Sequence, residues 1–335
     1  MKISNFVKIL FIALFFAFLI SFFVNSKFFN KFLKFNNTKT ESKEKKFEIE
    51  KDDSFRVFDK SSNEILDISK KDFLIGVLAA EMPAIFEDEA LKAQVVASHT
   101  YFINLKENQK KHPDEKLKGA DFEIDSKNHI NYITLDELKK KWGNSFDTHY
   151  EKFKKIVDLV GNIVILNEGQ PIVAVYHALS SGSTEKSSDV FLEDKPYLVP
   201  VPSPWDKLDS NYQSCVVLEE EEIKTKIQKE IPDVNLPSEK KEWFKIKESS
   251  DSGLIKKVSI GNKEIRGSKI REFFNLKSPC FSVDYEDGKF VFVTKGHGHL
   301  AGMSQCGAQS MAKDGCNFKE ILSHYFRGTT IMELT

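Results

Sequence analysis

The sequence predicts an α+β fold, in which mixed helices and antiparallel hairpins form one extracytoplasmic body with a small subdomain, preceded by a single N-terminal transmembrane helix. Segments with apolar residues at helical spacing are interspersed with short segments in which apolar and polar residues alternate. An almost uninterrupted apolar run stands apart from these at the N-terminus. The 335 residues suffice for one large domain or two smaller ones.

The N-terminal run is apolar from Ile9 to Val24 except for Ser21. With its flanks, at residues 6–26, it is long enough to span a membrane. It does not end in the small residues that precede a signal-peptide cleavage site, so we expect an uncleaved, single-pass signal-anchor in the cell membrane. Lysines on both sides leave its orientation undecided. The predicted organisation is a cytoplasmic end with signal-anchor at 1–26, a polar tether at 27–46, and an extracytoplasmic domain at 47–335.

The first half of this domain contains two expected strands followed by helices. Ser69, with Asp72 three residues later, begins a helix in the manner of a capping box that uses Asp in place of Glu. A later helix carries Leu91, Val95 and Phe102 on one stripe. In order, we expect strands at 47–50 and 55–58, a helix carrying 73–80, a helix at 87–105, polar irregular chain at 106–132, and a helix beginning at 134–138 that runs with breaks to 160.

The second half begins with a hairpin pattern whose second strand leads directly into a loop rich in hydroxyl residues. A subdomain is expected at about 215–275, where the acidic run Glu219–Glu222 begins a helix, because negative charge is favourable at a helix N-terminus. The remaining expected elements are strands at 162–166 and 171–176, the loop at 177–185, a segment at 270–274, a hairpin at 281–293, and helices at 305–313 and 318–325.

Composition excludes several classes of function. The net charge of −1 gives no indication of nucleic acid as a partner. No Cys-x-x-Cys occurs, so a zinc ribbon is excluded by spacing. In an oxidising compartment Cys306 could pair with Cys316, or Cys215 with Cys280, and free buried thiols are an equally good interpretation.

Glu81 is the first candidate for chemistry. It ends the apolar run 73–80, and Pro83 makes a continuing helix improbable at Met82. Apolar neighbours and the negative end of the helix dipole both favour the protonated carboxyl, which is the state of a general acid. On local sequence alone, a solvated helix-end Glu is the competing interpretation. The nearby carboxylates of residues 87–89 lie at a helix N-terminus, which keeps them ionised, and we interpret them as capping or surface groups.

Two further segments carry polar residues suited to a ligand. The loop at 177–185 offers hydroxyl groups around a glycine, and 296–308 has glycines at four positions that allow close backbone approach. His297 and His299 would share one face of a strand, which is also compatible with a metal ligand pair. Without a third ligand at sensible spacing, we predict no metal.

Together, Glu81-Met82-Pro83 with residues 90–94, the segment 176–185, and the segment 297–308 with Tyr325 and Gly328 resemble the stage II sporulation protein D family of peptidoglycan lytic transglycosylases. The resemblance covers roughly residues 50–335. It implies a membrane-anchored enzyme that cleaves the bond between N-acetylmuramic acid and N-acetylglucosamine during sporulation engulfment, leaving 1,6-anhydro ends on strands stripped of stem peptides. The implied partners are these denuded glycan strands, a membrane-associated amidase and a membrane scaffold protein.

The resemblance also implies the site. Glu81 is the catalytic acid and then base, and no cofactor is expected. A lytic transglycosylase uses the C6 hydroxyl of its substrate as nucleophile, so a second carboxylate is dispensable. Relatives commonly have Arg where this chain has His99, so a charge-based role there is in doubt. The predicted substrate-binding residues are Gln94, Tyr101, Tyr176, Ser180, Ser181, Thr184, Glu185, His297, Ser304 and Gln305.

Alternatives remain open at this stage. The runner-up is a non-catalytic glycan-binding module that enhances a cell-wall amidase, and a metal-dependent hydrolase built around His297 and His299 is third. Some relatives carry a Cys/His zinc site in the region that matches residues 110–132. Here that region keeps His112 and His129 but has no cysteine, so we predict no structural zinc.

Overall fold

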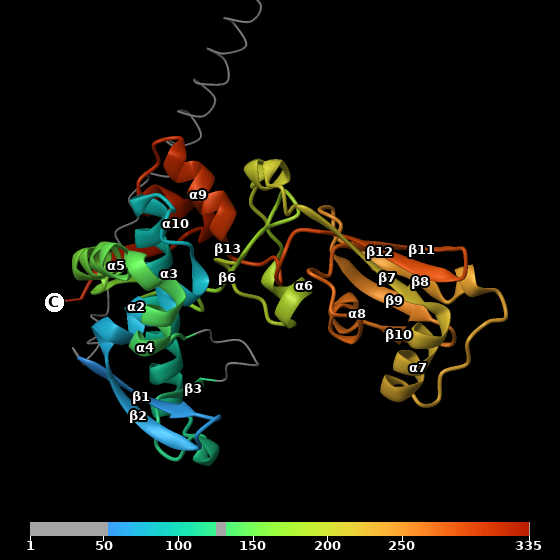
Figure 1. Ribbon diagram of the computed structural model, residues 1–335, viewed down its shortest axis with the longest axis horizontal. Helices are drawn as coiled ribbons and strands as arrows, with labels where there is room; N and C mark the ends of the chain where they lie inside the picture. Colours follow the sequence, from blue (N-terminus) through green and yellow to red (C-terminus); the bar gives the residue numbers. More distant parts are fainter. Residues whose placement is uncertain (1–52, 125–131, 335) are drawn as a thin grey trace, which may run out of the picture. The chain divides into compact units, whose positions relative to one another are not determined.

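The computed structural model describes residues 53–124 and 132–334, which belong to one compact unit (Figure 1). Helices and mostly antiparallel sheets confirm the α+β prediction. The expected strand at 47–50 and the expected transmembrane helix at 6–26 lie outside the described residues. Within the described ranges, no helix is both long and apolar enough to cross a membrane.

Two helices frame Glu81. Helix α2, Lys70–Glu81, begins as predicted, because the Ser69 hydroxyl accepts the Asp72 backbone N–H at 3.1 Å. Helix α3, Asp88–Lys111, continues six residues past its predicted end at Leu105. The extension has a physical cause that the polar sequence did not reveal: Lys106 is buried and forms an ion pair with Asp121 at 3.2 Å.

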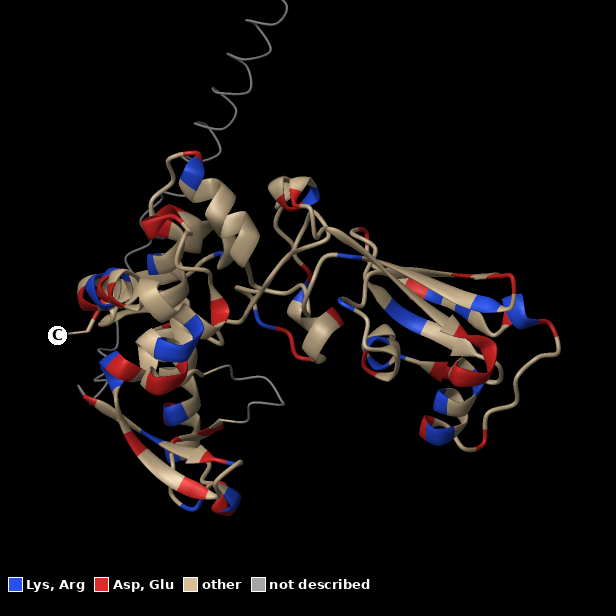
Figure 2. Cartoon of the chain, viewed as in Figure 1, with Lys and Arg blue, Asp and Glu red and all other residues tan. Residues whose placement is uncertain are grey.

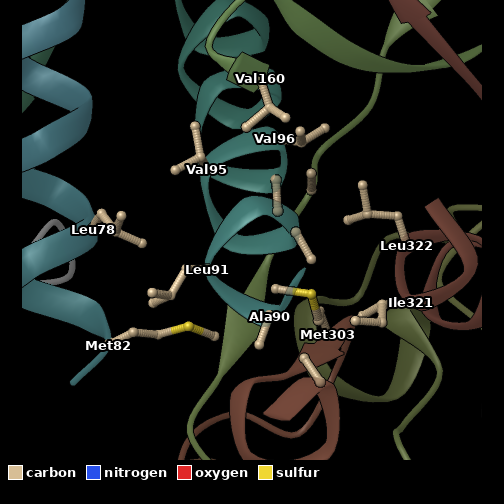
Figure 3. Close-up of a cluster of buried hydrophobic side chains, with 14 of the residues drawn as sticks. Leu78, Met82, Ala90, Leu91, Val95, Val96, Val160, Met303, Ile321 and Leu322 are labelled. Atoms are coloured by element: carbon tan, nitrogen blue, oxygen red, sulfur yellow. The ribbon is translucent and has the colours of Figure 1, made fainter. Parts of the chain in front are cut away.

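The main core surrounds α3 with helices. The Thr134 side chain and Glu137 form a capping box at the start of α4, where a helix start was predicted. Leu78, Met82, Leu91 and Met303 are among the buried side chains that fill the space between these elements (Figure 3). The helices packed against α3 are α2; α5, Phe146–Val160; α9, Gln305–Lys313; and α10, Phe318–Tyr325, while α4, Leu135–Trp142, packs against α2 and α5.

A small sheet lies beside this core, with strand order β2-β1-β3. Its strands are β1, Ser54–Asp59; β2, Glu64–Ser69; and β3, Phe122–Ile124. Strand β3, parallel to β1, was not predicted, because the region at 106–132 looked irregular. The strand exists because Phe122 packs against Phe55, Phe73 and Phe102 in a separate aromatic cluster.

The predicted hairpin at 162–176 is only partly correct. Strand β4, Ile163–Asn167, pairs with β5, Gln170–Pro171, of which only Pro171 belongs to the expected partner strand at 171–176. The other edge of β4 is taken by β14, Thr330–Glu333. Beyond β5, the N–H groups of Ala174 and Val175 bond carbonyls two residues back, which turns the chain away from a ladder.

The end of the expected second strand instead forms a parallel pair with a distant segment. Strand β6, Tyr176–His177, lies beside β13, Met303–Ser304. This pairing brings the predicted loop at 177–185 next to the predicted loop at 296–308.

A second core is built from two sheets and two helices. The predicted hairpin at 281–293 is confirmed and joins β7 in the sheet β11-β12-β7. Phe290 and Phe292 of this hairpin share the core with Trp243 and Ile270, so the segment expected as a subdomain at 215–275 packs together with a hairpin outside that range. Its elements are β7, Gln213–Glu219; α7, Glu220–Glu230; β8, Phe244–Ser249; β9, Ile255–Ile260; β10, Lys263–Ile265; α8, Gly267–Phe274; β11, Phe281–Glu286; and β12, Lys289–Lys295.

Among the described residues, five short elements complete the fold, of which α6 and η3 lie in the segment of chain between the two cores. They are 3₁₀ turns and one short helix: η1, Glu115–Leu117; η2, Gly143–Ser145; α6, Ser187–Phe191; η3, Pro204–Leu208; and η4, Lys240–Glu242. All four cysteines are free thiols, and Cys280 is buried. The structure therefore has neither of the two disulfide pairings that the sequence left open.

Candidate active site

Glu81 is the last residue of α2. The helix ends because Met82, which precedes Pro83, is extended (φ −128°, ψ 143°), while its N–H still bonds the Leu78 carbonyl at 2.9 Å. The Glu81 side chain is half-buried, and Leu78 and Met82, which flank it in the sequence, are buried. Figure 3 shows both of these apolar side chains facing α3. The carboxylate is therefore held at the edge of the main core, as predicted.

A hydrogen bond joins Glu81 to Gln305 of the third sequence motif. Gln305 is the first residue of α9, and the helix is capped by Ser304, whose hydroxyl accepts the Gly307 N–H at 3.2 Å. The Gln305 amide donates to Glu81 Oε2 at 3.0 Å and to Gln94 Oε1 at 3.3 Å. Since Gln305 is only 6% exposed, this donor is fixed in its position.

A chain of hydrogen bonds continues from Gln94 to the second motif. Gln94 donates through Nε2 to Ser98 Oγ at 3.0 Å, and the Ser98 hydroxyl donates to the Tyr176 hydroxyl at 3.4 Å. Burial, and then the nearby Glu81 charge, raise the Tyr176 pKa well above its usual value. Tyr176 therefore stays neutral next to Glu81. Ser98 was not among the predicted site residues, although it lies one helical turn beyond Gln94.

The predicted loop residues form bonds within the protein. The Thr184 hydroxyl donates to the Val199 carbonyl at 3.2 Å and accepts the Val201 N–H at 2.9 Å. Glu185 accepts from the hydroxyl groups of Ser250, at 2.8 Å, and Ser252, and burial raises its pKa. These bonds hold the loop in shape, and a role of either side chain toward a sugar remains a prediction.

Asp206 lies buried beside the second and third motifs, which together form what we call the wall of the candidate site. The sequence analysis did not select it. It lies in η3, is 1% exposed, and accepts the Ser180 N–H through Oδ2 at 2.9 Å. Burial raises its pKa, and the Ser180, Ser304 and Ser203 hydroxyls counteract that rise. Asp206 thereby lies between Ser180 of the second motif, whose N–H it accepts, and Ser304, the cap of α9. A single Asp in a proline-rich stretch offers no pattern that could have indicated this.

Glycines let the 296–308 loop lie against the second motif. Gly302 has φ +72°, and an added Cβ would come 2.1 Å from the Val175 carbonyl oxygen. At Gly307 a Cβ would come 2.0 Å from the Tyr325 hydroxyl, which bonds Ser203 Oγ at 2.9 Å. The close approach predicted for these glycines is thus made with the protein's own chain.

His297 and Ser181 both belong to the wall of the candidate site, but they differ in how far they are exposed to solvent. The His297 backbone exchanges two hydrogen bonds with Leu179, at 2.7 and 3.1 Å, while its side chain is exposed. Partial burial, together with the charges of Lys277 and Arg271, lowers the His297 pKa. Ser181 is buried, and its hydroxyl has no hydrogen-bond partner within residues 53–124 and 132–334.

Two residues of α3 face elsewhere. Tyr101 packs its ring against Phe102 at 5.6 Å between centroids, at the border of the aromatic cluster. His99 is fully buried, and its Nδ1 lies 2.9 Å from the Ile163 carbonyl of β4. It does not join the hydrogen-bonded chain from Glu81 to Tyr176, so the position that is commonly Arg in relatives serves packing here.

His99 gives a pH-dependent stability. Burial is the main cause that lowers its pKa to about 4. The unfolded chain binds this proton more readily, so the stabilisation is full above about pH 6.5 and is lost as the pH falls toward 4. Between about pH 6.5 and pH 4, we expect the loss of this contribution to lower the free energy of unfolding by about 3 kcal/mol.

The comparison that isolates this effect is with His99→Gln, whose amide can still donate to the Ile163 carbonyl. Urea unfolding between pH 7 and 4 should show a shallower loss of stability for the variant than for the unchanged protein. Equal pH slopes for the two proteins would contradict the assignment.

His112 and His129 fall in the region where some relatives carry a zinc site, and the structure describes only the first of them. His112 is an exposed residue at the C-terminus of α3, and His129 lies outside the described residues. Within the described ranges, no group of three or more His, Cys, Asp or Glu is arranged to hold a metal. With no cysteine at 110–132, the thiolate donors of such a site are missing.

Comparisons with known proteins point to one family. The family model described as Stage II sporulation protein matches residues 37–166. The chain is 33% identical to Stage II sporulation protein D of Bacillus subtilis (strain 168), over 84% of this chain and 79% of that protein, and 30% identical to that of Bacillus amyloliquefaciens over the same shares. It is 25% identical, over 77% of its length, to 40% of a B. subtilis protein named Amidase enhancer. The chain thus belongs to the stage II sporulation protein D family.

Proposed function

We propose that this chain is a membrane-anchored lytic transglycosylase that cleaves the bond between N-acetylmuramic acid and N-acetylglucosamine in peptide-stripped peptidoglycan during sporulation engulfment. The supporting observation is the hydrogen bond from Gln305 to Glu81, which joins residues 224 positions apart. Gln94 accepts from the same amide, and Tyr176 ends the chain of bonds that starts there. Three separate motifs thus converge on one carboxyl group, as an active centre requires.

One carboxyl group is enough for the proposed reaction. Glu81 donates its proton to the glycosidic oxygen as the bond from that oxygen to the muramoyl C1 breaks. The C6 hydroxyl of the same muramoyl residue then attacks C1 and gives its proton to the Glu81 carboxylate, which restores the acid. No water is consumed, and the product carries a 1,6-anhydro ring. Two-carboxylate glycosidases need their second group only to activate water or to attack the sugar.

The neighbours of Glu81 suit both steps. The Gln305 amide is a neutral donor that does not titrate. It can therefore hold Glu81 Oε2 in place while Glu81 Oε1 gives and takes the proton. Tyr176, held neutral by burial, is linked to this site through the hydrogen bonds of Ser98 and Gln94. The buried Leu78 and Met82 place apolar side chains close to Glu81 in the sequence.

The product decides between this reaction and its alternatives. Purified protein is incubated with denuded glycan strands in water enriched in ¹⁸O, and the products are analysed by mass spectrometry. We expect 1,6-anhydro ends without ¹⁸O. Reducing ends that carry ¹⁸O would show a hydrolase instead and contradict the proposal.

A second candidate is a non-catalytic glycan-binding module that enhances a cell-wall amidase. Its support is the similarity to the relative named Amidase enhancer. In the same experiment, this function gives strand binding with no cleavage, together with faster product formation by a cell-wall amidase when the protein is added. A membrane-associated amidase and a membrane scaffold are the partners proposed for either function.

A further inference from the structure

A separate pocket lies between α6, β9 and α8, which are neighbours in Figure 1. Its volume is about 30 Å³. The polar and charged side chains at its wall come from α6, from the second core and from the 296–308 loop. They are Asp189, Lys256, Arg266, Ser268, Arg271 and His299.

The wall of this pocket, which we call the cationic pocket, carries three cations and one carboxylate. Asp189 already pairs with Lys256 at 3.1 Å. Arg266 donates to the carbonyls of Asp189 and Val190, at 3.0 and 2.9 Å, and so attaches α6 to α8. Across residues 53–124 and 132–334, neither Arg266 nor Arg271 has a carboxylate at ion-pair distance, so the pocket keeps a surplus of positive charge. Figure 2 shows Lys and Arg in blue on β9 and α8, the two elements that carry Lys256 and Arg271.

Arg271 is the cation best placed to bind a ligand. It is half-buried, and burial lowers its pKa. Its Nε donates to the Leu276 carbonyl at 3.3 Å, which orients the guanidinium plane and leaves the two terminal nitrogens for another partner. A partly buried charge without a counter-ion is costly, and an anion offsets that cost. The planar fork of a guanidinium group suits a carboxylate, which it can bind through two parallel hydrogen bonds.

The cationic pocket adjoins the wall of the candidate active site. The His299 ring lies 5.5 Å from the His177 ring, and His177 directly follows Tyr176 in β6. His177 Nδ1 lies 3.0 Å from the Ala301 carbonyl. Burial, and then the positive charges of His299 and Arg271, lower the His177 pKa well below its usual value. One segment, β6, therefore contributes both to the hydrogen-bonded chain at Glu81 and to the edge of the cationic pocket.

We propose that the cationic pocket binds the free lactyl carboxylate of a muramic acid residue, at a neighbouring sugar position of the strand on which Glu81 acts. The proposal rests on the proposed function, because it needs a glycan strand in that site. A stem peptide converts the lactyl carboxylate into an uncharged amide, and bound peptide also adds bulk. Arg271 therefore selects strands from which an amidase has already removed the peptide.

The test compares two ligands that differ only in this charge. The full chain carrying Glu81→Gln, which prevents cleavage, is titrated with a denuded muramoyl oligosaccharide and with the same oligosaccharide after its carboxylates are converted to methyl amides. We expect about tenfold tighter binding of the free acid at low salt, and a smaller difference at high salt. Equal affinities for the two ligands overturn the proposal without any further variant.

Two substitutions assign the effect to this pocket. Adding Arg271→Gln should remove the preference and leave binding of the amidated ligand unchanged, while Arg271→Lys should retain part of it. The matched control is Lys247→Gln, which removes one exposed charge from β8 of the same core, outside the pocket. A preference that survives Arg271→Gln, or that Lys247→Gln also removes, counts against the pocket.

Failure of this proposal and failure of the proposed function give different results. If the unchanged protein cleaves no strand but the Arg271-dependent preference is measured, the pocket stands and the transglycosylase function fails. If the unchanged protein produces anhydro ends and the two ligands bind equally, the pocket fails and the function stands.

Discussion

Glu81→Gln is expected to lower the rate of 1,6-anhydro product formation by about a thousandfold or more. An amide can neither donate a proton to the leaving oxygen nor accept one from the C6 hydroxyl, so both steps lose their catalyst. The fold should persist, because the replacement has the same shape and its amide oxygen can still accept from Gln305. Product formation is followed by mass spectrometry, and folding by circular dichroism and the melting temperature.

The matched control is Glu87→Gln, which removes a nearby carboxylate that is exposed and lies at the N-cap of α3. Its activity should equal that of the unchanged protein. Glu81→Asp should retain some activity, because it keeps the carboxyl group but withdraws it by one methylene. Anhydro ends formed at the normal rate by Glu81→Gln would exclude Glu81 as the acid.

Asp206→Ala is expected to destabilise the protein by about 3 kcal/mol and to reduce activity as well. The substitution leaves the buried Ser180 N–H without its acceptor, since Asp206 Oδ2 is that acceptor at 2.9 Å. It also removes the group that lies between Ser180 and Ser304, the cap of α9. Gln305 begins α9, so disorder at the cap reaches the donor to Glu81. Unfolding in urea measures the first effect, and formation of anhydro ends measures the second.

Two variants separate this role from a general loss of charge. Asp206→Asn keeps an oxygen acceptor for the Ser180 N–H and should recover much of the stability. Asp233→Ala removes an exposed carboxylate of the second core and should change the unfolding free energy by less than about 0.5 kcal/mol. Asp206→Ala with unchanged stability and activity would refute the structural role assigned to Asp206.

Local signals in the sequence were sufficient for many of the elements. Ser69 caps α2 and the Thr134 capping box begins α4, because these bonds involve residues three apart in the chain. The hairpin of β11 and β12 follows from alternation and a turn at Asp287-Gly288, which has positive φ at both residues. Strand β3 could not be found in this way, because its three residues are specified by Phe55 and Phe102 from other elements.

Of the candidate site, only the residues that belong to a sequence motif could be predicted. Glu81, Gln94, Tyr176 and Gln305 were selected from short segments, and the structure joins them by hydrogen bonds. The residues that support them were not selected: Ser98 and Asp206 are single polar residues without a motif. Their importance comes only from being buried opposite a partner far away in the chain, and burial of that kind is a property of packing.

By itself, the sequence determined the α+β class, the ends of α2, and the family to which the chain belongs, because capping, turn chemistry and motif order are local properties of the chain. Only the tertiary structure decided that Tyr176 pairs with Met303 in a parallel bridge in place of a longer hairpin, that His99 faces β4, and that Gln305 reaches Glu81. The physical reason is that these contacts depend on which surfaces the cores bury together. Packing of the cores determines which residues lie next to each other in space, and the local sequence around a residue does not indicate them.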